Sequence, residues 1–108
     1  MDDRLYKRLE KIERSIEELR EVEARFLALE AHKKVLYSQV FLTAEGKNVA
    51  EKEANAYASQ DWRDFVGGLV KAETAFNHAR RMYELRLKAY DAEHLTLKTE
   101  TPAIKRHG

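Results

Sequence analysis

The chain has 108 residues, of which 44% are hydrophobic and 36% charged, and its formal net charge is +1. Four glycines, one proline and no cysteine exclude collagen-like and glycine/proline-rich disordered chains, disulfide scaffolds and thiolate metal sites. The near-neutral charge gives no overall electrostatic preference for nucleic acid, a membrane surface or an acidic substrate.

The first predicted element is a long helix over about residues 2–42, a stretch without glycine or proline. Its first apolar residues recur at alternating steps of four and three positions, which places them on one face of a helix. These residues are Leu5, Leu9, Ile12, Ile16 and Leu19. Val22 follows Leu19 after three positions where four were due, which predicts a stammer that locally overwinds a coiled coil.

A turn over residues 43–48 is predicted to end this helix. Gly46 is expected to form a left-handed C-terminal cap. Asn48 is the expected N-cap of a short alanine-rich helix over about residues 49–57, and Glu51 completes a pattern like a capping box. Ser59 or Gln60 is expected to interrupt the helical run.

A second long helix is predicted over about residues 61–98. Its apolar residues repeat at steps of three and four, and they are Trp62, Phe65, Leu69, Ala72, Phe76, Ala79 and Tyr83. The pair Gly67-Gly68 predicts a close approach to another helix, with a kink as the alternative. The helix is expected to end between Leu97 and Thr101, before Pro102, and residues 101–108 to form a flexible tail.

Two long helices with a short connection predict a single all-α domain over residues 1–100, folded as a long antiparallel, coiled-coil-like hairpin. Further apolar residues flank the main rows: Tyr6, Leu27, Val35, Phe41, Val66, Val70, Met82, Leu85 and Leu95. A two-helix hairpin buries one stripe per helix, so these flanks favour a homodimer that forms a four-helix bundle.

The sequence contains no pattern typical of an enzyme or a metal centre. Di-metal sites in helical bundles need repeated Glu-x-x-His motifs, whereas Asp91-x-x-His94 is the nearest match and does not recur. No glycine-rich phosphate loop is present, because Gly67-Gly68 lies inside a helical repeat. We therefore expect no catalytic, cofactor-binding or metal-binding residue, and a protein that is not an enzyme.

Five aromatic residues are expected to gather at the end of the hairpin where its helices are connected. They are Tyr37, Phe41, Tyr57, Trp62 and Phe65. Aromatic side chains are frequent anchors of protein interfaces, but they also close the ends of helical bundles. The sequence leaves both interpretations open, and it makes this group the candidate site for a protein partner.

The alternative candidate is a nucleic-acid-binding groove on the last helix. Its basic residues are Arg80, Arg81, Arg86 and Lys88. Tyr83 and Tyr90 lie among them, but the helical register assigns both to the buried stripe, and acidic neighbours dilute the positive charge. These residues either form a solvated face or assemble a basic groove across a dimer.

No apolar run reaches the roughly 18 residues that a transmembrane helix needs. The first residues, Met1-Asp2-Asp3-Arg4, have neither the apolar core of a signal peptide nor the acid-poor character of a transit peptide. These features predict a cytoplasmic protein without a membrane partner.

One stretch is similar to a known group of proteins. An E-G-x-N turn at Glu45–Asn48 is followed by A-E-x-E-A at Ala50–Ala54, then by Leu69–Glu73 and by Arg81-x-x-x-x-Arg86. Over about residues 30–97 the chain resembles small helical accessory proteins of bacteriophages and prophages. The resemblance implies action in recombination or replication, or inhibition of a host factor, in the host cytoplasm. It assigns no catalytic residue.

The sequence thus predicts a non-enzymatic, self-associating helical protein that acts by binding another protein. A nucleic-acid-binding accessory factor is the alternative, and a structural assembly component is a third reading.

Overall fold

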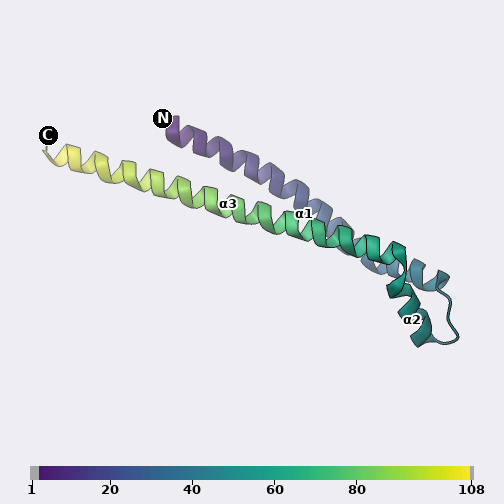
Figure 1. Ribbon diagram of the computed structural model, residues 1–108. Helices are drawn as coiled ribbons and strands as arrows, with labels where there is room; N and C mark the ends of the chain where they lie inside the picture. The colour runs from purple at the N-terminus through teal and green to yellow at the C-terminus, as the bar shows by residue number, and fades with distance from the viewer. Residues whose placement is uncertain (1–2, 108) are drawn as a thin grey trace. The chain divides into compact units, whose positions relative to one another are not determined.

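The computed structural model describes the backbone of residues 3–107 and the side chains of residues 3–98. Three helices make up this part of the chain: α1 spans Asp3–Thr43, α2 spans Val49–Ala58 and α3 spans Gln60–His107 (Figure 1). No strand occurs within residues 3–107. The predicted all-α fold class is confirmed.

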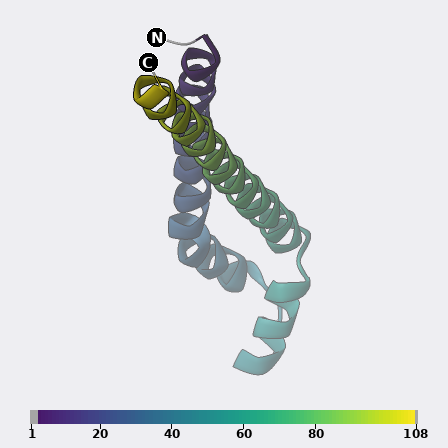
Figure 2. The same ribbon diagram turned by 90° about the vertical axis from the view of Figure 1, so that its left-hand side faces the viewer.

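The chain divides into two compact units, and both long helices contribute to each of them. Unit 1 comprises Met1–Glu21 and Asn77–Gly108, and unit 2 comprises Val22–Phe76. In unit 1, the first part of α1 lies beside the last part of α3 (Figures 1 and 2). Unit 2 contains the rest of both helices together with α2.

The helices of unit 1 are antiparallel. Near the start of α1, Arg8 Nε donates a hydrogen bond to Glu93 Oε2 at 2.8 Å. Two turns further along α1, Ser15 Oγ accepts a hydrogen bond from Arg86, which lies two turns before Glu93 on α3. Contacts that advance along α1 therefore move back along α3.

The helices of unit 2 pair in the same sense. Phe26 of α1 stacks on Phe76 of α3, with the ring centroids 5.6 Å apart. His32, further along α1, meets Phe65, which is earlier in α3, with the centroids 6.4 Å apart. The segments of α1 and α3 within unit 2 are therefore antiparallel too.

A regular three–four spacing marks the residues at which each long helix faces its neighbour, and we call these residues the seam. On α1 the seam consists of Leu5, Arg8, Ile12, Ser15, Leu19, Val22, Phe26, Leu29, Lys33, Leu36 and Val40. On α3 it consists of Trp62, Phe65, Leu69, Ala72, Phe76, Ala79, Tyr83, Arg86, Tyr90, Glu93 and Leu97. All of these residues are buried or half-buried except Lys33, which is exposed.

Polar residues in the seam remove the need for the predicted stammer. Ser15 is only 1% exposed and lies on the seam, whereas Ile16 is half-buried beside it. In the same way, Arg8 lies on the seam and contacts Glu93 of α3, whereas Leu9 lies beside the seam. With Arg8 and Ser15 as seam residues, the three–four spacing passes Leu19 without a break. The prediction was wrong because it assumed that every seam position is apolar.

The seam divides each long helix into two sides. We call residues that directly follow a seam residue the trailing side, and those that directly precede one the leading side. Because the helices are antiparallel, the leading sides of α1 and α3 adjoin each other. A groove in unit 1 accordingly brings Arg4 together with Ala89, and a groove in unit 2 brings Arg25 together with Lys71. All four residues directly precede seam residues.

Large apolar side chains are concentrated on the trailing side. The trailing side carries Tyr6, Leu9, Ile16, Leu27, Tyr37, Phe41, Val66, Val70 and Leu87. Within residues 3–98, the leading side carries Val35, Met82 and Leu85. Each unit therefore has one apolar side and one mostly charged or small-residue side.

Gly46 does not form the predicted left-handed cap, since no glycine in the described range has a positive φ. The end of α1 is closed instead by Ala44 N–H, which donates to Phe41 O at 3.2 Å, and by the Thr43 hydroxyl, which bonds to Val40 O at 3.1 Å. A Cβ on residue 46 would lie 2.6 Å from Lys52 N. Glycine is required there because the loop passes close to the backbone of α2.

The start of α2 and the break before α3 use side-chain caps. Asn48 Oδ1 accepts a hydrogen bond from Glu51 N–H at 2.9 Å, as expected for an N-cap. Ser59 is extended, with φ −64° and ψ 148°, and its hydroxyl accepts from Trp62 N–H at 3.2 Å. Ser59 therefore interrupts the helical run and caps α3.

Gly67 and Gly68 do not mark a close approach within the chain. Apart from the neighbouring backbone of α3 itself, a Cβ at either position would meet no heavy atom within 4 Å. The helix continues through both residues, so the close packing predicted here does not occur between the helices within the described part of the chain.

α3 continues through Pro102 to His107, past the end predicted between Leu97 and Thr101. A proline removes one backbone hydrogen bond from a helix but does not by itself prevent further turns. The sequence between Gly68 and Gly108 contains no glycine that would favour an end of the helix near Pro102. The flexible tail predicted over residues 101–108 falls where no side chain is described.

Within residues 3–107, none of the helices combines the length and the apolar character that crossing a membrane requires.

Candidate functional site

The five aromatic residues singled out in the sequence come together in unit 2. Tyr37 lies at the centre, with its ring centroid 5.2 Å from that of Tyr57, 5.4 Å from that of Trp62 and 6.2 Å from that of Phe41. The Trp62 centroid is in turn 5.7 Å from that of Phe65. We call these five residues the aromatic cluster.

Three helices supply the cluster. Tyr37 and Phe41 lie one turn apart on α1, Tyr57 lies near the end of α2, and Trp62 is in the first turn of α3. The break at Ser59 allows the chain to change direction between Tyr57 and Trp62. Those two rings then meet edge to face, 6.0 Å apart and inclined by 69°.

The aromatic cluster is partly core and partly surface. Trp62 is buried and packs with Val40 and Ala56 to form the core of this unit. Tyr57 is 54% exposed, although it touches both Trp62 and Tyr37. Core packing is therefore observed for Trp62, whereas Tyr57 stays a candidate contact for a protein partner.

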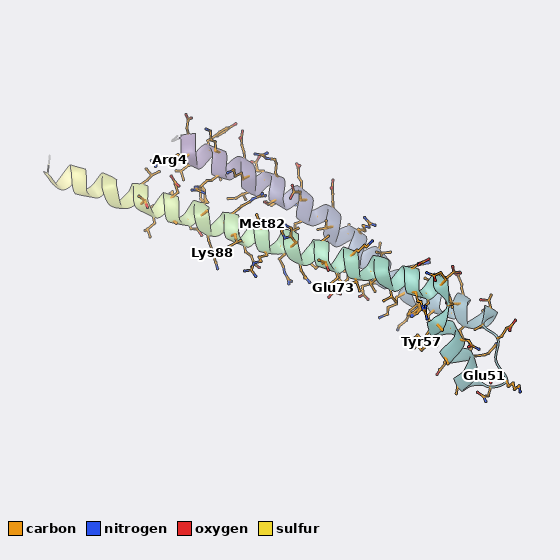
Figure 3. The ribbon with its side chains drawn as sticks, in the orientation of Figure 1. Arg4, Glu51, Tyr57, Glu73, Met82 and Lys88 are labelled. Atoms are coloured by element: carbon orange, nitrogen blue, oxygen red, sulfur yellow. The ribbon has the colours of Figure 1, made fainter. Side chains whose placement is uncertain are left out.

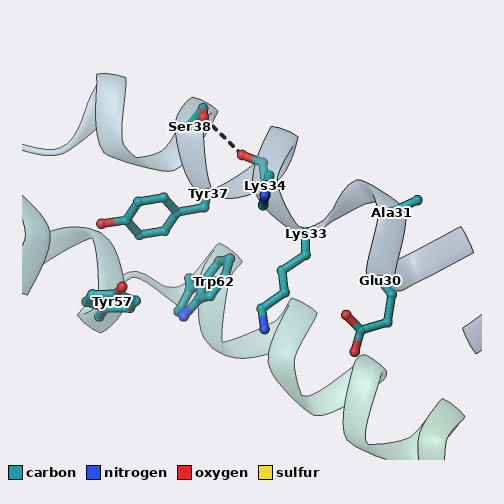
Figure 4. Close-up of a pocket in the computed structure, with 8 residues that line it drawn as sticks. All are labelled: Glu30, Ala31, Lys33, Lys34, Tyr37, Ser38, Tyr57 and Trp62. Atoms are coloured by element: carbon teal, nitrogen blue, oxygen red, sulfur yellow. Dashed lines mark hydrogen bonds between the residues drawn. The ribbon is translucent and has the colours of Figure 1, made fainter. Parts of the chain in front are cut away.

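A groove of about 820 Å³ opens beside the exposed part of the cluster, and we call it the aromatic groove. It is lined by Glu30, Ala31, Lys33, Lys34, Tyr37, Ser38, Tyr57 and Trp62. Figure 4 shows Tyr37, Tyr57 and Trp62 gathered at one end of the groove, with Lys33 extending beside Trp62. The Ser38 hydroxyl is occupied, because it donates to Lys34 O at 2.9 Å.

Lys33 explains why the groove opens here. It holds a seam position, yet it is exposed, so the seam of α1 is interrupted beside Trp62. The sequence prediction missed the lysines of the groove because it considered aromatic residues alone. Lys33 and Lys34 stand four and three positions before Tyr37, which is the spacing that puts helical residues on one face. That spacing is the signal that identifies them.

The environment of Tyr37 changes its acidity. Desolvation in the aromatic cluster raises the pKa of the Tyr37 phenol above its usual value of 10.0. The hydrogen bond with Tyr57 and the negative charge of Glu53 raise this pKa further. A tyrosine with the ordinary pKa of 10.0 is already neutral at physiological pH, and the raised pKa extends the neutral range of Tyr37 to higher pH.

The basic residues of the alternative site are not gathered on one surface. Arg86 lies on the seam of unit 1 and donates to Ser15, so its guanidinium points between the helices. Arg80 donates to Asn77 Oδ1 at 3.4 Å on its own helix. Arg81 is exposed, and Lys88 points away from α1 (Figure 3).

A second polar group lies on the seam of unit 1. Glu93 pairs with Arg8 at 2.8 Å and with Arg4 at 3.3 Å, and its side chain is only 15% exposed. These three residues line a smaller groove of about 340 Å³. The carboxylate is thus already neutralised by arginines of the same unit.

Among the side chains of residues 3–98, no three His, Asp or Glu residues lie close enough together to hold a metal ion.

Comparison of the chain with protein-family models, curated proteins and solved structures found no match.

Proposed function

We propose that this protein is a non-enzymatic helical protein that self-associates and acts by binding another protein. Each copy forms an antiparallel helical hairpin, and two copies pack through the trailing sides of unit 1 to make a four-helix bundle. One observation carries this proposal: Ile12 is the only large hydrophobic side chain that is buried among the described residues of unit 1.

The polar seam explains why unit 1 needs a partner. Arg8, Ser15, Arg86 and Glu93 occupy seam positions at which a stable helical pair usually has apolar residues. Hydrogen bonds satisfy these groups but contribute only about 0.5–1.5 kcal/mol each. A two-helix unit with so little buried apolar surface is marginal on its own.

The trailing side supplies the missing apolar surface. Leu9, Ile16 and Leu87 are half-buried there, and Tyr6 is exposed. Complete burial of a side chain of this size contributes about 1.5–3 kcal/mol relative to exposure. A two-fold interface uses each residue twice, so the remaining burial amounts to several kcal/mol for the dimer.

Neighbouring leucines on opposite sides of α3 test this interface. We expect Leu87→Lys, on the trailing side, to shift the molecular mass measured by light scattering from dimer to monomer. Leu85→Lys, on the leading side, is the matched control and should leave the dimer intact, since Leu85 is 49% exposed and outside the proposed interface.

Because Leu87 is half-buried, Tyr6→Lys serves as a second variant at an exposed trailing position. Circular dichroism checks that each variant remains helical. Dissociation by Leu85→Lys but not by Leu87→Lys or Tyr6→Lys would assign the interface to the other side and contradict the proposal.

The partner protein is assigned to the aromatic groove of unit 2. Trp62 and Tyr57 are of the residue types that dominate interface energetics, and the groove beside them is open. The similarity to small phage proteins adds the proposal that the partner is a factor of the host cell. The nucleic-acid alternative is supported less well, since Arg86 is turned inward to Ser15.

A further inference from the structure

The aromatic groove has a shape suited to a helix rather than to a compact ligand. It follows α1 from Glu30 to Ser38, which at about 1.5 Å per residue corresponds to about 12 Å, or roughly two helical turns. Three exposed apolar residues, Leu27, Val66 and Val70, continue along the same trailing side of unit 2. They share this side with Tyr37, and we call these three residues the apolar strip.

The aromatic rings pack against each other and do not surround a cavity that could hold a cation. The centroids of Tyr37, Tyr57 and Trp62 are separated by 5.2–6.0 Å, so the rings contact each other and leave no space for a cation between them. Lys33 and Lys34 also line the groove and would repel an organic cation. The groove is therefore suited to an apolar anchor that lies against the rings.

Lys33 and Lys34 favour a negatively charged group in the molecule that occupies the groove. Within the described range neither Lys33 nor Lys34 forms a salt bridge, whereas Glu30 is the only acidic residue that lines the groove. A carboxylate placed beside Lys33 and Lys34 would be attracted to both ammonium groups and shielded by the aromatic rings from part of the solvent.

The charge of the whole unit favours a protein over a nucleic acid. Val22–Phe76 contains seven Lys and Arg residues and eight Asp and Glu residues, so its formal charge is −1. A phosphate backbone binds mainly through many basic contacts, which this unit lacks. A short acidic segment needs only the local pair Lys33 and Lys34.

We propose that the aromatic groove binds an amphipathic helix of a partner protein, with an apolar residue against Tyr57 and Trp62 and Asp or Glu residues beside Lys33 and Lys34. This inference rests on the proposed function, because it identifies the chemistry of the protein partner. The strip formed by Leu27, Val66 and Val70 contacts the next turns of the bound helix, as in other helix-in-groove complexes.

A selection from a helix-biased random peptide library tests the proposal, with the peptides standing in for the helix of the partner. The full chain is immobilised, bound peptides are sequenced, and the best binder is labelled for fluorescence anisotropy. We expect selected peptides to combine apolar residues at three–four spacing with adjacent Asp or Glu. Affinity should fall as salt is raised, because the rim contacts are electrostatic.

Charge reversal identifies the site of binding. The double variant Lys33→Glu/Lys34→Glu should weaken peptide binding by about tenfold or more, as expected for the loss of a charged rim. Lys47→Glu/Lys71→Glu makes the same charge change in the same unit away from the groove and should alter binding by less than about twofold. Circular dichroism confirms that both variants remain folded.

Several results would overturn the inference. These are a library without enriched peptides, enrichment of basic sequences, equal effects of the two double variants, or loss of single-stranded DNA binding on Lys33→Glu/Lys34→Glu. Dissociation of the dimer by that variant would show that a second copy occupies the groove. The mass of the same samples by light scattering is the separate test of self-association, so failure of the groove assignment is distinguishable from failure of the proposed function.

Discussion

Ser15 and Arg86 form the most buried polar contact of unit 1. Ser15→Ala removes the one acceptor that the described structure gives to the Arg86 guanidinium. Because Arg86 is half-buried and keeps access to water, we expect the free energy of unfolding to fall by about 1 kcal/mol. Urea denaturation at a fixed protein concentration measures the change.

Ser38→Ala is the matched control for this prediction. The Ser38 hydroxyl is exposed and bonds only to Lys34 O on its own helix, so its loss should be neutral or slightly stabilising. Equal destabilisation by the two variants would show that the contact between Ser15 and Arg86 has no special role.

Glycine substitutions should have opposite effects at two positions. Gly67→Ala should raise the free energy of unfolding by about 0.5–1 kcal/mol, because the added methyl group meets no atom within 4 Å beyond the neighbouring backbone of α3 and alanine favours a helix. Gly46→Ala should lower it, because the Cβ would lie 2.6 Å from Lys52 N. Thermal unfolding of both variants tests the pair, and a change of the same sign in both would contradict this account.

The raised pKa of Tyr37 predicts a loss of stability at alkaline pH. The folded state binds the phenolic proton more tightly than the unfolded state, whose pKa is close to 10.0. The stability linked to this proton is therefore complete below pH 10.0 and is lost as the pH rises through the higher folded pKa.

Tyr57→Phe should lower the pKa of Tyr37 toward its usual value, because the substitution removes a hydrogen bond that raises it. Absorbance titration of the tyrosines follows this change, with Tyr37→Phe identifying the signal of Tyr37. If Tyr37 ionises at the same pH with and without Tyr57→Phe, the assignment is wrong.

At the scale of the elements, the local signals of the sequence locate the helices well. The N-cap at Asn48 and the break at Ser59 are short-range features, so they predict the limits of α2 closely. Gly46 shows the limit of such reasoning. Residue 46 must be glycine because the backbone of α2 lies close to it. Rules for helix caps do not include such a contact between separate elements.

The face of α1 was harder to predict than its length. Apolar periodicity selects Leu9 and Ile16, whereas the structure places Arg8 and Ser15 on the seam. A polar seam residue is recognisable only when its partner on the other helix is known. The aromatic cluster was predicted, whereas the contribution of Lys33 and Lys34 to the groove was missed for a different reason, because only aromatic residues were considered there.

Two valines of similar exposure test the trailing strip of unit 2. Val70 is 56% exposed on the trailing side and Val35 is 50% exposed on the leading side. Val70→Lys should weaken binding of a selected amphipathic peptide, because the strip would then present a charge to the apolar face of the peptide. Val35→Lys should leave the affinity unchanged. A larger effect of Val35→Lys, measured by fluorescence anisotropy, would contradict the assignment of sides.

At the scale of the whole molecule, we propose different roles for the two units. A second copy of the chain would cover the apolar side chains that the polar seam of unit 1 leaves open. Unit 2 has its own core cluster around Trp62, and its groove is the proposed site for a partner protein. If this proposal is correct, self-association and partner binding can be separated by substitution.

The mass of the protein in solution tests the central claim most directly. Light scattering over a range of concentrations, with and without short single-stranded DNA at low and moderate salt, should give twice the 12.6 kDa mass of the chain and no response to DNA. A mass of one chain at all concentrations would contradict the four-helix bundle. A salt-sensitive increase on adding DNA would instead favour nucleic-acid binding.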